Sequence, residues 1–173
     1  MRPFFLAALV ALPHAALADA HSQTPAEAVA VVEDRDGNAI GNVRIVATPS
    51  GIMHVVVQLE GLDAGVNGAH LHEVGDCSAS DFTSAGDHIS GDAEHGPMAE
   101  GGPHPGDLPN LHIQSDGVAA AEFFNDRIDM ATLLDEDGSA FILHAQSDDY
   151  VSQPGGNAGD RIACGVIQAA LDQ

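Results

Sequence analysis

Positive charge is the property that this sequence has least of. Its 173 residues include no lysine and only five arginines, against 26 aspartates and glutamates, which gives a formal net charge of −21. Five scattered arginines cannot form the basic groove that binding to a nucleic acid requires. The same deficit argues against attachment to an anionic membrane surface. We therefore expect no nucleic-acid partner and no membrane partner.

Large aromatic residues are also scarce. Trp is absent and aromatic residues make up 4% of the chain, so Val, Ile, Leu and Ala must supply the core. The 19 glycines and nine prolines favour many turns over long helices. With 45% of its residues hydrophobic and 18% charged, the chain has the composition and length of one folded domain.

Alternating side chains predict an all-β fold. Apolar and more polar residues alternate over 53–60, which is the period-two pattern of a strand with one buried face. Asp36-Gly37 and Ser50-Gly51 stand where hairpin turns are needed, so three strands are expected within 28–62. Further strands bring the expected number to eight, with no convincing helix, and lie at 70–72, 108–115, 118–124, 139–144 and 161–170. This pattern indicates an antiparallel β-sandwich or barrel.

Two long segments do not fit strands. Residues 75–107 and 145–160 are rich in Gly, Pro, Asp and His and have little apolar periodicity. Loops of this length are usually functional or disordered. Most of the histidines lie inside or beside them, which favours a functional role.

The N-terminus has the parts of a secretory signal peptide. Met1-Arg2 precedes an apolar stretch over 3–17, and Ala18-Asp19-Ala20 offers small residues for cleavage after Ala18 or Ala20. The apolar stretch is short for a membrane span, although an uncleaved anchor is the alternative. We predict a leader over 1–20, an exported domain over 21–173, and no membrane attachment after cleavage.

Two cysteines, Cys77 and Cys164, remain in the exported part. Export to an oxidising compartment makes a disulfide the default for such a pair. Two free buried thiols are the alternative.

The ten histidines are the most informative residues. In His70-Leu71-His72 the alternation of a strand puts both imidazoles on one face and Leu71 on the other. This motif alone is weak evidence, because chance or surface placement also produces it. His144 ends another predicted strand, and the loop between them carries His88, His95, His104 and Asp107. Imidazole suits copper and zinc, and seven ligands are too many for one tetrahedral ion and about right for two.

Four segments resemble copper/zinc superoxide dismutases, and they follow the family's order and spacing. They are Gly-Ala-His-Leu-His-Glu at 68–73, Thr-Ser-Ala-Gly-Asp-His at 83–88, His-Pro-Gly-Asp-Leu-Pro-Asn at 104–110, and Gly-Asn-Ala-Gly-Asp-Arg-Ile-Ala-Cys-Gly-Val-Ile at 156–167. The resemblance implies an eight-stranded antiparallel Greek-key β-sandwich or barrel with two long functional loops. The spacing between Cys77 and Thr83 resembles the bacterial branch, which agrees with a periplasmic location.

The resemblance also assigns residues to roles. It implies a copper ion held by His70, His72, His88 and His144. It implies a zinc ion held by His88, His95, His104 and Asp107, with His88 bridging the two metals. It further implies a Cys77–Cys164 disulfide, an anion-guiding Arg161, and an Asp148 carboxylate that braces ligands of both ions.

The expected reaction is the dismutation of superoxide to dioxygen and hydrogen peroxide. Copper with imidazole ligands can change its oxidation state, whereas zinc with four protein ligands is structural. His88 is then a candidate general acid and Arg161 a permanent positive charge for a small anion. A periplasmic copper/zinc carrier with the same fold and little turnover is the alternative. A zinc hydrolase is a third hypothesis. Asp107 argues against it, because this residue would fill the open position that a catalytic zinc needs. A homodimer is compatible with the resemblance, and no apolar patch in the sequence identifies an interface.

Overall fold

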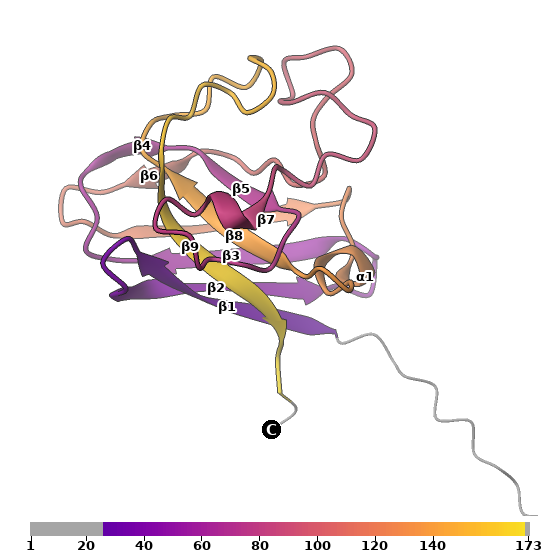
Figure 1. Cartoon of the computed structure of the whole chain (residues 1–173). Coiled ribbons are helices and arrows are strands. Elements are labelled where there is room, and N and C mark those ends of the chain that lie inside the picture. Colours follow the sequence, from indigo (N-terminus) through magenta and orange to yellow (C-terminus); the bar gives the residue numbers. More distant parts are fainter. Residues whose placement is uncertain (1–25, 172–173) are drawn as a thin grey trace, which may run out of the picture.

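The computed structural model describes residues 26–171, so the predicted leader over 1–20 lies outside the described residues. Within this range the chain forms nine strands, one short α-helix and one 3-10 turn (Figure 1). Every strand pairing is antiparallel. The predicted all-β, antiparallel architecture is thus confirmed. No helix in the described range is long and apolar enough to cross a membrane.

Seven strands form one curled sheet. Their spatial order is β5-β8-β9-β1-β2-β3-β7. The bounds in chain order are β1 Glu27–Asp34, β2 Ala39–Ala47, β3 Met53–Leu59, β5 Ala69–His72, β7 Ala119–Asn125, β8 Ser139–His144 and β9 Arg161–Ala169. The three strands expected within 28–62 are therefore β1, β2 and β3.

Alternation of side chains builds the core of this sheet. In β3 the side chains of Met53, Val55, Val57 and Leu59 are buried, while the residues between them are more exposed. β1 and β2 repeat the pattern, and their inward side chains join the same apolar cluster. Burial of this apolar area stabilises the fold by about 25 cal/mol for each Å² removed from water.

The remaining elements are short and differ most from the sequence-based expectation. β4 (Gly65–Asn67) was not predicted, and it pairs with β6 (Leu111–Ile113), which is shorter than the strand expected over 108–115. The expectation of no helix was also wrong in detail, because α1 (Met130–Leu133) makes one turn. The Asp129 carboxylate caps α1 by accepting from Thr132 N at 2.8 Å. An element of this size is too short to produce a periodic sequence signal.

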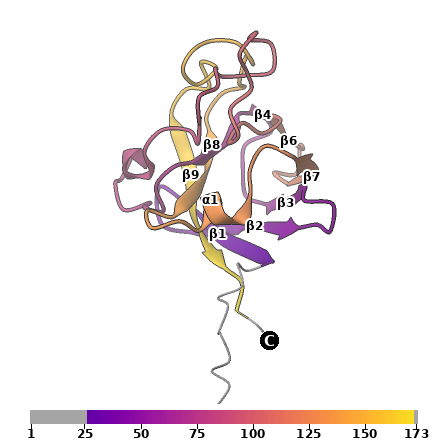
Figure 2. The ribbon, with the colours of Figure 1, turned by 90° about the vertical axis from the view of Figure 1, so that its right-hand side faces the viewer.

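The later, pink part of the first loop and the second loop lie at the same end of the molecule in both views, whereas the earlier, magenta part of the first loop lies beside β8 and β9 (Figures 1 and 2). Backbone contacts join them, since Met98 N donates to Tyr150 O at 3.1 Å. Side chains add to this, since Asn110 Nδ2 donates to Asp148 O at 2.9 Å. Segments far apart in the sequence therefore meet above β5 and β8.

A disulfide between Cys77 and Cys164 ties the first loop to β9, with the two Cα atoms 5.9 Å apart. The disulfide prediction is confirmed, and the alternative of two free thiols is excluded.

Replacing both Cys77 and Cys164 by Ala should lower the free energy of unfolding of the metal-free protein. The bridge closes a loop of 87 residues, for which the chain-entropy model gives about 4–5 kcal/mol. Denaturant unfolding of the variant, of oxidised wild type and of reduced wild type measures the loss in the free energy of unfolding. An unchanged unfolding midpoint would contradict this role.

Candidate metal centre

The short strand β5 positions two of the predicted site histidines, His70 and His72. Leu71 points into the core and is fully buried, so His70 and His72 share the opposite face. β5 is the last strand of the sheet and pairs with β8 on one side only. Its free edge is taken by the first loop: Ile89 N donates to Leu71 O at 2.9 Å and Leu71 N donates to Gly106 O at 2.8 Å.

This edge pairing brings the loop ligands to the strand. Isolated bridges place His88 opposite His72 and Asp107 opposite His70. Gly106 must be a glycine here, because a Cβ atom would overlap the Leu71 carbonyl oxygen. Backbone hydrogen bonding therefore places the side chains of two separate loop segments beside the His-x-His motif.

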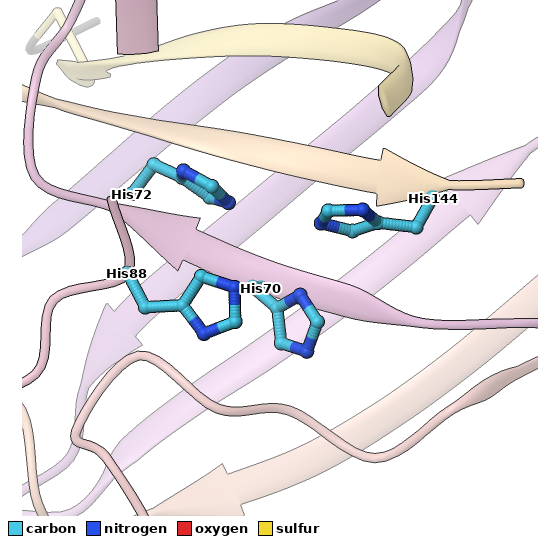
Figure 3. A group of neighbouring side chains, drawn as sticks. All are labelled: His70, His72, His88 and His144. Carbon is cyan, nitrogen blue, oxygen red and sulfur yellow. The ribbon is translucent and has the colours of Figure 1, made fainter. Parts of the chain in front are cut away.

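Four imidazoles gather at one point, from β5, β8 and the first loop (Figure 3). One ring nitrogen from each lies within 4.8 Å of the others, in the group formed by His70, His72, His88 and His144. His144 comes from the end of β8, and its ring points toward His72 on the neighbouring strand. The sequence predicted this group, and the structure brings all four of its members together.

Hydrogen bonds leave one nitrogen free on each of three of these rings. His70 Nε2 donates to Asp148 Oδ2 at 2.8 Å, His72 Nδ1 to Gly86 O at 2.9 Å, and His144 Nδ1 to Gly159 O at 3.1 Å. Because an oxygen without a proton can only accept, these contacts fix which nitrogen carries the hydrogen. The opposite nitrogens, His70 Nδ1, His72 Nε2 and His144 Nε2, are buried and have no hydrogen-bond partner. A cation is the natural partner for buried, converging lone pairs, so the residues fit a bound metal.

A second group surrounds one carboxylate oxygen. Asp107 Oδ1 lies 3.1 Å from His88 Nδ1, 3.1 Å from His95 Nδ1 and 3.3 Å from His104 Nδ1. A tetrahedral zinc with bonds of about 2.0–2.1 Å separates its ligand atoms by about 3.3–3.4 Å. The other oxygen, Asp107 Oδ2, is occupied by Gly96 N at 2.8 Å and His104 N at 2.9 Å. The spacing and the donor set therefore fit a zinc ion.

Asp148 joins the two groups. Its Oδ2 accepts from His70 Nε2 at 2.8 Å, and its Oδ1 contacts His95 Nε2 at 3.0 Å. Tyr150 N also donates to Oδ1, at 2.6 Å. The carboxylate is fully buried, so it orients one histidine from each group without competition from water.

Burial keeps the clustered imidazoles neutral. It lowers the pKa of His70 to about 3, against the opposing effect of Asp148. It lowers the pKa of His72 to about 2 and that of His144 to about 4. Burial alone would raise the pKa of Asp107, but hydrogen bonds from His88 and Gly96 lower it to about 2. At neutral pH these groups are thus three neutral imidazoles and one carboxylate, which are the protonation states that bind metals.

A cavity of about 470 Å³ opens onto the first group, and His72, His88, His144 and Arg161 are among its lining residues. Arg161 begins β9, where it is the cross-strand partner of His144. Its Nη1 donates to Phe82 O and its Nη2 to Gly86 O, both at 2.7 Å. The guanidinium is therefore held rigidly in the cavity wall.

The sequence did not reveal two supporting contacts. Gln153 pairs its side-chain amide with the backbone of His95: Oε1 accepts from His95 N at 2.8 Å and Nε2 donates to His95 O at 3.0 Å. The Gly86 carbonyl oxygen serves both His72 and Arg161. Backbone acceptors and a loop glutamine have no sequence signature, so only coordinates reveal them.

Comparison with known proteins agrees with this geometry. The family model for copper/zinc superoxide dismutase matches residues 39–167. The chain belongs to the copper/zinc superoxide dismutase family. A Caulobacter vibrioides protein named Superoxide dismutase [Cu-Zn] is 41% identical over 149 residues, which cover 82% of this chain and 85% of that protein.

Solved structures of family members share the fold. A superoxide dismutase-like protein from Bacillus subtilis is 36% identical, with a TM-score of 0.74 over 80% of this chain and 96% of its own. The Cu/Zn superoxide dismutase of Brucella abortus is 29% identical, with a TM-score of 0.68 over 82% and 99%. The bacterial relatives agree with the branch that the sequence resembles.

Replacing Asp148 by Asn should weaken the binding of metal at both groups. An amide can accept at only one end, so either His70 or His95 loses the acceptor that orients its ring. Changes of this kind typically cost 10–100-fold in metal affinity, which competition with a chelator measures for copper and for zinc. Asp149→Asn serves as the control, because it removes the same charge at the adjacent residue, whose carboxylate makes no hydrogen bond to a histidine. Equal affinities in the Asp148 variant and wild type would contradict the bracing role.

Proposed function

We propose that this protein converts two superoxide anions and two protons into dioxygen and hydrogen peroxide at a centre of one copper and one zinc ion. The copper ligands are His70, His72, His88 and His144, and the zinc ligands are His88, His95, His104 and Asp107. One observation carries the proposal: buried imidazole nitrogens without partners converge beside a second group of ligand atoms, and by distance His70 and His88 belong to both groups.

Two neighbouring histidines, His70 and His104, are candidates for the fourth zinc ligand. Distance alone groups His70 with His88, His95 and Asp107. However, His70 Nε2 is committed to Asp148, and its Nδ1 is the one buried nitrogen that this ring can offer to the four-histidine group. The Nδ1 atom of His104 has no hydrogen-bond partner and lies 3.3 Å from Asp107 Oδ1. His104 is therefore the better fourth ligand, as the sequence predicted.

His88 is assigned to both ions because its ring nitrogens serve different groups. Its Nδ1 contacts Asp107 Oδ1 at 3.1 Å, which leaves Nε2 for the four-histidine group. Copper supplies the one-electron chemistry of the reaction, which zinc cannot supply. When Nε2 of His88 is not bound to a metal, it would hold a proton and would donate it to the reduced oxygen species as a general acid.

Arg161 is proposed to bind the anion. Its charge is permanent, and both terminal nitrogens are fixed by backbone carbonyls, so it enters the cavity wall already oriented. His144, directly across β8 and β9 from it, faces the same cavity. An incoming anion thus meets a guanidinium beside the four-histidine group.

The carrier alternative fits these features less well. A carrier needs ligands for its cargo but has no need of a cavity that leads past an oriented arginine to three of the four histidines. Fold similarity alone does not separate the two readings, because the Bacillus subtilis relative is named only superoxide dismutase-like. The complete set of ligand side chains and Arg161 favours the enzyme.

The leader and the location are part of the same proposal. Residues 1–20 are proposed to be a secretory signal peptide that delivers residues 21–173 to the bacterial periplasm, where an oxidising environment agrees with the Cys77–Cys164 disulfide. N-terminal sequencing of the exported protein tests this proposal. A homodimer stays a prediction.

Replacing His144 by Ala should remove copper and activity while zinc remains bound. The loss of one of four imidazoles opens the copper group, whereas no nitrogen of His144 belongs to the zinc group. Metal analysis together with the superoxide decay rate measures both effects. The matched variant Asp107→Ala should lose zinc first. Unchanged copper content in the His144 variant would remove that residue from the ligand set.

Replacing Arg161 by Gln should slow the reaction with both metals in place. Loss of a positive charge beside the reacting centre should lower the second-order rate constant at low ionic strength on the order of tenfold. Pulse radiolysis measures this rate for samples of equal metal content. Arg127→Gln removes an equal charge from an exposed position and should leave the rate unchanged. Equal rates for the Arg161 variant and wild type would refute the guiding role.

A further inference from the structure

We call the cavity that opens onto the four-histidine group the copper cavity. Its wall carries two opposite formal charges. Among its lining residues, His apart, only Asp87 and Arg161 carry a formal charge. Asp87 directly precedes His88 in the chain, and its side chain is exposed. The positive charge that would attract an anion is therefore accompanied by a negative charge in the same wall.

The backbone of Asp87 is fixed, while its carboxylate is left unneutralised. Glu73 N donates to Asp87 O at 3.0 Å, and Asp87 N donates to Glu73 Oε1 at 3.3 Å. Within residues 26–171, no ion pair and no side-chain hydrogen bond reaches the Asp87 carboxylate. The carboxylate is thus held by no direct contact, and the opposite charge on which it acts is Arg161 in the same cavity wall.

One peptide group connects the two charges. Arg161 Nη2 donates to Gly86 O at 2.7 Å, and this carbonyl belongs to the peptide bond that joins Gly86 to Asp87. Movement of the arginine relative to Asp87 is thus restricted. Any anion that approaches Arg161 also approaches the carboxylate.

We propose that the Asp87 carboxylate limits the attraction of the copper cavity for superoxide and so lowers the rate at which this anion enters. This inference rests on the proposed function. Asp87 repels an anion at the last stage of approach, where low-dielectric walls make a single charge more effective than the same charge on open surface. Asp87, and not the net charge of −21 alone, then sets the rate of entry and its dependence on salt.

The test compares Asp87→Asn with wild type and with Glu136→Gln, all loaded with copper and zinc. Glu136 lies in the turn before β8, and His144 lies at the other end of that strand. The control variant therefore removes an equal charge at the end of β8 that is far from the four-histidine group. Pulse radiolysis gives the second-order rate per bound copper at low and at physiological ionic strength. We expect a gain on the order of threefold for Asp87→Asn at low salt, a smaller gain at 0.15 M where screening acts over about 8 Å, and no gain for Glu136→Gln. Titration with azide, a small anion that is not consumed, gives a second readout: Asp87→Asn should bind azide more tightly than wild type, and an unchanged azide affinity would contradict the inference.

Asp87→Glu keeps the charge and should behave as wild type, which separates charge from shape. An active wild type with no gain in Asp87→Asn would overturn this inference and leave the proposed function standing. Equal gains in Asp87→Asn and Glu136→Gln, or in Asp87→Asn and Asp87→Glu, would also overturn it. If the fully loaded wild type does not dismute superoxide, the proposed function itself fails. Because rates are expressed per bound copper, a variant that binds less metal still gives a decisive value.

Discussion

Buried imidazole nitrogens that lack hydrogen-bond partners are the constraint on which this structure depends. His70, His72 and His144 each give one nitrogen to an oxygen acceptor and leave the other facing a shared point. Leaving a buried polar atom unpaired typically costs about 1–3 kcal/mol, so several together are unfavourable unless a ligand satisfies them. The folded chain therefore prepares the site at a cost that metal binding offsets. Stability and metal content are linked for this reason.

The free edge of β5 explains how distant segments reach this point. A sheet edge offers unpaired backbone groups, and here the first loop pairs with them and delivers His88 and Asp107 beside the His-x-His motif. The disulfide anchors the same loop, whose Gly86 carbonyl then holds both His72 and Arg161. Backbone pairing, the covalent bridge and side-chain orientation thus act on one short segment.

Much of this arrangement could be predicted from the sequence, and the reasons are specific. Strict alternation identified β3, and the same period placed His70 and His72 on one face with Leu71 in the core. Two cysteines in an exported chain already favoured the disulfide, whereas only the resemblance supplied Asp148. The sequence could not show that β4 and β6 are three-residue strands, nor which nitrogen of each ring is free. Those features depend on backbone acceptors such as Gly86 and Gly159, which any residue type could provide.

The proposed chemistry depends above all on a His88 side chain that lies between two metal ions. Anomalous diffraction at the copper and zinc absorption edges, from crystals of the protein loaded with both metals, tests it most directly. We predict one copper peak among His70, His72, His88 and His144, and one zinc peak among His88, His95, His104 and Asp107. A single ion, or two ions of which only one is bound by His88, would contradict the account.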